Sequence, residues 1–147
     1  MKDLKKVFGD NWIHKEGKIT KLVCKEKNSS YTFINNGKYH IVSYKVDEGL
    51  VSEGKRCDYL FGLNEPEMIY FIELKGCDLN NAALQLSETI KRFSHKISGW
   101  KLNARAVVSK VSYPGVMPSQ VLRLKRELAS RGGNFEIKCK SLIEEAK

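Results

Sequence analysis

Two charged residues in the middle of the chain have the types and spacing of a catalytic site. Glu73 and Lys75 lie at the end of the most apolar segment, residues 68–74 (MIYFIEL). Side chains alternate between the two faces of a strand, so Glu73 and Lys75 project to one side and Leu74 to the other. Desolvating a carboxylate and an ammonium at the end of a central strand is costly. The spacing therefore indicates a functional site; the alternative is a surface salt bridge at a strand end.

A second carboxylate is expected to join them. Asp58 lies near the start of a short strand predicted over residues 57–63. If that strand and residues 68–74 form an antiparallel hairpin, Asp58 and Glu73 fall near the same end of the sheet. These two carboxylates, with the main-chain carbonyl of Leu74, suit Mg²⁺ or Mn²⁺, which prefer oxygen ligands.

A lysine close to such an ion would act on the reaction rather than on the metal. It could orient the attacking water, help to lower the pKa of that water, or offset negative charge developing on a phosphate. A metal, a water and Lys75 together predict hydrolysis of a phosphodiester.

The first half of the chain is predicted to be β-structure. Residues 19–25, 31–34 and 39–46 are rich in β-branched and aromatic residues. An Asn-Asn-Gly sequence at 35–37 is typical of a tight turn, so residues 31–46 are predicted to form a hairpin.

The second half alternates helices and strands. Apolar residues spaced three and four apart, from Leu79 to Phe93, predict a helix whose N-cap is Asp78. A strand over 104–109, a helix that Pro118 opens, and a strand from Phe135 to Cys139 follow; Gly132-Gly133 ends that second helix. This order predicts one α/β (α+β) domain over residues 1–147, with a mixed central sheet flanked by helices.

The pattern around Asp58, Glu73 and Lys75 resembles the motif of the PD-(D/E)xK nuclease superfamily, which includes many restriction enzymes and archaeal Holliday-junction resolvases. The matching segments are RCDY at 56–59 and FIELKG at 71–76. The resemblance implies a restriction-endonuclease-like core, here preceded by an N-terminal β-hairpin. It also implies that the three motif residues are catalytic.

Other positions bear on the same resemblance. Gln85, in ALQLSETI, looks like the auxiliary polar residue that members often carry on the helix after the motif, where it would hydrogen-bond the water or the scissile phosphate. Cys57 stands where many members have proline. Many members also carry a glutamate on a helix before the first core strand; here Glu48 and Glu53 lie in a predicted loop, and neither is expected to be a ligand.

The charge balance favours an anionic partner. Lysine and arginine number 26 against 17 acidic residues, a formal charge of +9, and nucleic acid is the commonest partner of such chains. Candidate phosphate contacts are Lys55, Arg56, Lys91, Arg92 and Lys96, and the alternative is an ordinary solvated surface. No segment approaches about 18 consecutive apolar residues, so no membrane span is expected.

The cysteines predict neither disulfides nor zinc. The four residues, Cys24, Cys57, Cys77 and Cys139, form no CxxC pair and have no histidine at zinc-ligand spacing. They are most simply unpaired thiols in a reducing cytosol. The N-terminal segment lacks the apolar core of a signal peptide, so a cytoplasmic location is expected.

These features together predict a Mg²⁺- or Mn²⁺-dependent DNA endonuclease, with phage defence or DNA repair as its setting by analogy. A domain of this length leaves no room for a separate specificity domain. It would recognise DNA structure, act as a homodimer, or depend on a partner protein for specificity. Two alternatives stay open: a catalytically inactive nuclease-fold module that binds nucleic acid, and a basic adaptor that binds an acidic protein.

Overall fold

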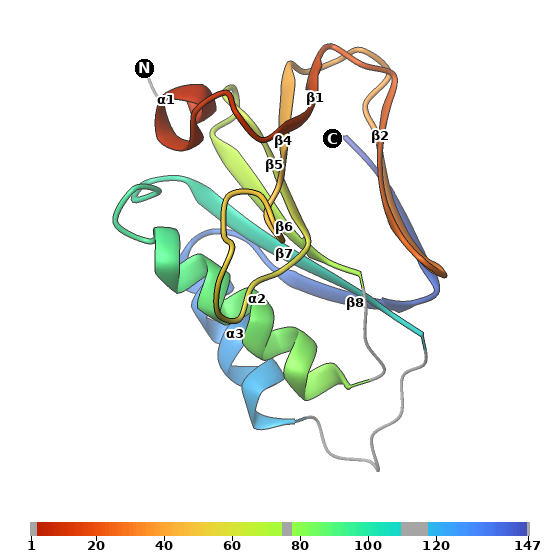
Figure 1. The fold of residues 1–147 in the computed structure, drawn as a ribbon, viewed down its shortest axis with the longest axis vertical. Helices are drawn as coiled ribbons and strands as arrows, with labels where there is room; N and C mark the ends of the chain where they lie inside the picture. The colour runs from red at the N-terminus through yellow and green to blue at the C-terminus, as the bar shows by residue number, and fades with distance from the viewer. Residues whose placement is uncertain (1–2, 75–77, 110–117, 147) are drawn as a thin grey trace.

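A six-stranded mixed sheet forms the centre of the molecule (Figure 1). The computed structural model describes residues 3–74, 78–109 and 118–146. The strands, in their order across the sheet, are β1 (Ile13–Gly17), β4 (Ile41–Lys45), β5 (Tyr59–Leu63), β6 (Met68–Glu73), β7 (Lys101–Val108) and β8 (Phe135–Cys139). From β1 to β6 neighbouring strands are antiparallel, and β6, β7 and β8 are parallel.

Helices cover one face of this sheet. The main ones are α2 (Leu79–Phe93) and α3 (Ser119–Ser130), and the short α1 (Leu4–Phe8) packs its Leu4 into the same core. The predicted N-cap of α2 is confirmed, because the Asp78 side chain accepts a hydrogen bond of 3.1 Å from the Asn81 amide. The apolar stripe of α2 is buried against β6 and β7, which fixes the helix directly after the end of β6. None of the described helices is long and apolar enough to cross a membrane.

A second, three-stranded sheet covers the opposite face. It contains β2 (Lys21–Glu26), β3 (Ser29–Ile34) and β9 (Ser141–Glu145), in the order β2-β3-β9. Its inner side chains pack with those of the central sheet in a separate apolar core, which includes Leu22, Tyr31, Phe33, Phe61, Ile72 and Leu74. A mixed α and β fold is therefore confirmed. The prediction that helices flank the sheet was wrong for this face, where a small sheet takes their place.

The hairpin predicted over residues 31–46 was also wrong. β3 pairs with β2, whereas β4 pairs with β1 and β5, so the two segments belong to different sheets. The turn between them exists: the buried Asn35 side chain donates hydrogen bonds to the carbonyls of Ile19 and Tyr39, at 2.9 and 2.8 Å. These bonds stabilise a crossing from one sheet to the other, and the true hairpin at this end of the chain is β2–β3.

A buried arginine joins β9 to the rest of the fold. Arg105 on β7, 3% exposed, donates from its Nε to Glu144 on β9 at 2.8 Å, and its Nη2 lies 3.2 Å from Glu136 on β8. The Tyr31 hydroxyl donates to the same Glu144 at 2.6 Å. These contacts help to hold β9 parallel to β3, a pairing between segments more than a hundred residues apart.

Candidate active site

Asp58 and Glu73 lie at the same end of two adjacent central strands. β5 and β6 are antiparallel, with Tyr59 opposite Ile72. Asp58 directly precedes that pair and Glu73 directly follows it, so the predicted hairpin and the common end of the two acidic residues are confirmed. Both residues are only 1% exposed, although each carries a carboxylate.

The backbone fixes Asp58 between two strands. Its Oδ2 accepts a hydrogen bond of 2.8 Å from the Leu74 amide, in the buried interior. Its own amide donates to the Ile72 carbonyl at 3.0 Å, and its carbonyl accepts from the Val46 amide at 2.9 Å. Asp58 is therefore tied to the end of β6, next to Glu73, and to the segment that follows β4.

Cys57 lies close to both carboxylates. Burial raises the pKa of the Cys57 thiol well above its usual range, and the charges of Glu73 and Asp58 raise this pKa further. Burial and Asp58 likewise raise the pKa of Cys24, on the neighbouring sheet, to about 12. Both residues stay neutral thiols near pH 7, so neither adds a thiolate charge at this end of the sheet.

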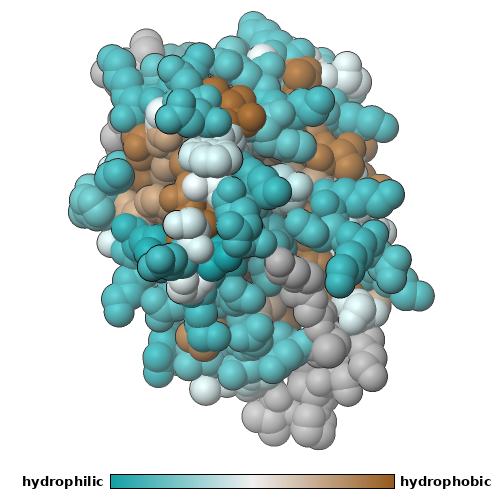
Figure 2. Space-filling model, viewed as in Figure 1, coloured by the Kyte–Doolittle hydropathy of each residue, from teal (hydrophilic) through white to brown (hydrophobic). Residues whose placement is uncertain are grey.

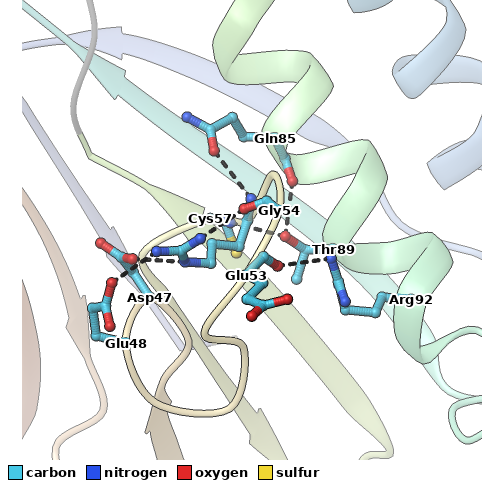
Figure 3. A network of polar contacts seen from close by, with 9 residues as sticks. Asp47, Glu48, Glu53, Gly54, Cys57, Gln85, Thr89 and Arg92 are labelled. Carbon is cyan, nitrogen blue, oxygen red and sulfur yellow. Dashed lines mark hydrogen bonds and ion pairs between the residues drawn. The ribbon is translucent and has the colours of Figure 1, made fainter.

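Helix α2 holds the backbone directly before Asp58 (Figure 3). The Thr89 hydroxyl accepts a hydrogen bond of 2.8 Å from the Cys57 amide and donates one of 2.8 Å to the Gln85 carbonyl. One turn earlier, Gln85 Oε1 accepts from the Arg56 amide at 3.1 Å. Two successive amides are thereby fastened to one face of the helix.

These contacts change the interpretation of two residues. Gln85 was predicted to contact the water or the scissile phosphate, and its described contact is instead with the Arg56 backbone. Thr89 was not singled out from the sequence. One signal is present in the sequence: Thr89 is a polar residue one turn after Gln85, on the helix segment bounded by the apolar Leu86 and Ile90. A polar side chain buried there must find a hydrogen-bond partner.

Arg56 organises the loop that precedes Asp58. Its Nε donates to Asp47 at 2.8 Å and its Nη2 to Glu48 at 2.9 Å, with 19% of the Arg56 side chain exposed (Figure 3). Two carboxylates thus offset the charge of this residue, whose contact with phosphate stays a prediction. Glu48 is turned toward Arg56.

The other predicted phosphate contacts divide between the two ends of α2. Lys55 lies near the carboxylates, where its Nζ is 3.4 Å from Asn81 in the first turn of the helix. Lys91, Arg92 and Lys96 are exposed at the opposite end, and the Arg92 guanidinium donates to the Glu53 carbonyl at 3.0 Å. The structure therefore does not gather the five residues into one surface around the carboxylates.

The donor set at this end of the sheet fits a hard cation by its chemistry. It consists of the Asp58 and Glu73 carboxylates and the Leu74 carbonyl, all oxygen donors, and Mg²⁺ is commonly held by one or two carboxylates with water completing the shell. Among the described residues there is no group of three or more His, Cys, Asp or Glu side chains that could hold a metal ion. Lys75 and Cys77 lie outside the described residues.

Comparison with known proteins identifies no relative of this chain. No family model matches it, and neither does any curated protein or solved structure. The site itself contains two buried carboxylates, oxygen donors only, and a helix that fixes the backbone beside them.

Proposed function

We propose that the protein is a Mg²⁺- or Mn²⁺-dependent nuclease of the PD-(D/E)xK type that hydrolyses phosphodiester bonds of DNA. One observation carries this proposal. Asp58 and Glu73 are both almost fully buried, and they lie at the same end of two adjacent central strands, directly beyond the Tyr59–Ile72 pair. Two carboxylates at the same end of a sheet supply the oxygen ligands that a divalent cation such as Mg²⁺ takes in proteins.

Each residue would have its own role. Asp58, Glu73 and the Leu74 carbonyl would hold the ion, which would supply Lewis-acid stabilisation and lower the pKa of water. Lys75 would orient the attacking water or offset negative charge developing on the phosphate. Gln85 and Thr89 position the backbone that carries Asp58.

Two further features support this function. The antiparallel strands β4 to β6 are followed by α2 and then by the parallel β7, an order that suits the restriction-endonuclease-like core implied by the resemblance. The formal charge of +9 favours a polyanionic substrate. Specificity would come from DNA structure, a homodimer or a partner protein. Free thiols at Cys24, Cys57 and Cys139 are compatible with action in the cytosol.

The direct test is incubation of the purified protein with supercoiled, linear and branched DNA in the presence of Mg²⁺, Mn²⁺ or EDTA. The proposal predicts cleavage with either metal and none with EDTA. Asp58→Asn and Glu73→Gln, which keep side-chain shape but remove charge, should abolish cleavage. Glu88→Gln, on the exposed side of α2, is the matched control and should cleave as the wild type does.

Two results would contradict the proposal. Wild-type protein that binds DNA without cleaving it, at any metal concentration, would identify an inactive nucleic-acid-binding module. Protein that neither binds nor cleaves DNA at low salt would favour the basic adaptor.

A further inference from the structure

Two tight turns place exposed lysines on one edge of the molecule. Lys27 lies in the β2–β3 turn and Lys25 near the end of β2, and Lys140 lies in the β8–β9 turn and Lys138 near the end of β8; all four are exposed. We call these four residues the lysine edge. Its two halves adjoin, because the Ser30 amide of β3 donates to the Lys140 carbonyl at 3.1 Å. Figure 2 shows hydrophilic side chains along this edge.

The lysine edge lies at the same end of the fold as the carboxylates. β8 runs parallel to β6 and β7, so its last residues lie where β6 ends at Glu73. β9 begins there, and β3 begins beside it, with Ser30 opposite Ser141. Figure 1 shows the two turns meeting at this end of the sheets.

A contact between the sheets supports this placement. Cys24, near the end of β2, packs in the same apolar core as Tyr59, the residue after Asp58. The His14 ring lies 5.1 Å from the Tyr59 ring, and its Nε2 lies 3.3 Å from the Val23 carbonyl on β2. The end of β2 is therefore next to the start of β5. Segments 25–30 and 138–141 together contain four lysines and one acidic residue, Glu26, so the net charge of the edge is positive.

The backbone does not favour lysine at either turn. Lys27 has a φ of 45° and Lys140 a φ of 67°, in the left-handed region where glycine and asparagine are preferred. A lysine is strained there relative to those residues, and both turns nonetheless present a positive charge toward solvent. Functional sites are where such local strain is commonly retained.

We infer that the lysine edge contacts the phosphodiester backbone of the DNA substrate and directs it toward Asp58 and Glu73. This inference rests on the proposed nuclease function and gives it a binding surface. Lysine contacts with phosphates position a nucleic acid without reading its sequence, and they make affinity depend steeply on salt. The surface differs from Lys91, Arg92 and Lys96, which lie at the far end of α2.

The test is the double variant Lys27→Asn, Lys140→Asn. Asparagine suits the left-handed backbone, so the variant should fold with unchanged or slightly higher stability. The matched control is Lys18→Asn, Lys38→Asn: both lysines are exposed, and they lie at the opposite end of the β2–β3 pair. The two variants lose the same net charge, so they differ only in its position.

The inference predicts that the edge variant binds duplex DNA about 10- to 100-fold more weakly at 0.1 M salt, with a slope of log affinity against log salt that is smaller by about 2. In cleavage assays its KM should rise while kcat at saturating DNA stays unchanged. The control should change either quantity less than about threefold. A second pair, Lys25→Gln with Lys138→Gln, removes charge beside the turns and should reproduce the loss if the first pair folds poorly.

Distinct results would overturn distinct claims. If the wild type cleaves DNA and the edge variants match it in affinity and KM, the lysine edge is not the binding surface. Equal losses in the edge variant and the control would show that net charge, rather than this surface, determines affinity, and would also overturn the inference. Wild-type protein that does not bind DNA would overturn both this inference and the proposed function.

Discussion

The carboxylate of Asp58 accepts a hydrogen bond of 2.8 Å from the backbone amide of Leu74, the residue that follows Glu73. Asp58 thus helps to fix the strand that carries the second carboxylate. Asp58→Asn keeps an oxygen acceptor at this position, whereas Asp58→Ala leaves a buried amide unsatisfied. We predict that the alanine variant is less stable than the asparagine variant by about 1–3 kcal/mol. Urea unfolding of the two variants measures this difference, and equal stabilities would contradict it.

We predict that the hydroxyl group of Thr89, rather than its volume, stabilises the fold. It is fully buried and accepts from the Cys57 amide. Thr89→Val preserves the shape but leaves that amide unpaired, so the free energy of unfolding should fall by about 1–3 kcal/mol. Thr89→Ser keeps the hydroxyl and loses one methyl group, which should cost about 1 kcal/mol. If valine proves as well tolerated as serine in chemical denaturation, the hydroxyl is not what holds the backbone before Asp58.

Lys75→Met tests the role that the sequence assigns to the lysine. Methionine keeps a long apolar stem and removes the charge, so the variant should fold and should still bind Mn²⁺ and DNA. Cleavage should be slower by about 10²- to 10⁴-fold, the usual range for a general acid–base or electrostatic contribution. Single-turnover rates at saturating metal are the measurement. A rate equal to that of the wild type would remove Lys75 from the mechanism.

The cysteines should differ sharply in reactivity. Burial raises the pKa of Cys24 to about 12 and that of Cys57 well above its usual range, whereas Cys139 is exposed. Because a raised pKa keeps a thiol protonated, Cys24 and Cys57 should resist iodoacetamide at pH 8.5, and Cys139 should react first. Peptide mass spectrometry assigns the labelled sites, with urea-unfolded protein as the control in which all of them react. Rapid labelling of Cys57 in folded protein would contradict the buried site.

Local signals explain what could be predicted of the site. Asp58, Glu73 and the hairpin that joins their strands were predicted because a short loop brings consecutive strands together. The N-cap at Asp78 and the helix after it follow from residues within a few positions of each other. The end of the sheet that carries both carboxylates is therefore largely determined by nearby sequence.

Non-local pairing explains what could not be predicted. Residues 31–34 and 39–46 have the composition of a hairpin, yet β3 finds its partners in β2 and in β9 near the C-terminal end of the chain. No local sequence signal predicts that pairing, which depends on a shared apolar core and on the ion pair between the buried Arg105 and Glu144. The same lack of long-range information left the lysine edge unrecognised, because its two halves lie more than a hundred residues apart.

The central claim is that Asp58 and Glu73 share one divalent cation, and titration with Mn²⁺ tests it most directly. Isothermal calorimetry, or the loss of free-ion signal in electron paramagnetic resonance, should show Mn²⁺ binding to the wild type. Binding should be lost or weakened at least about tenfold in both Asp58→Asn and Glu73→Gln, since each removes a ligand charge, and retained in Glu88→Gln. A wild type that binds no Mn²⁺, or Asp58→Asn and Glu73→Gln variants that bind it as the wild type does, would contradict the account.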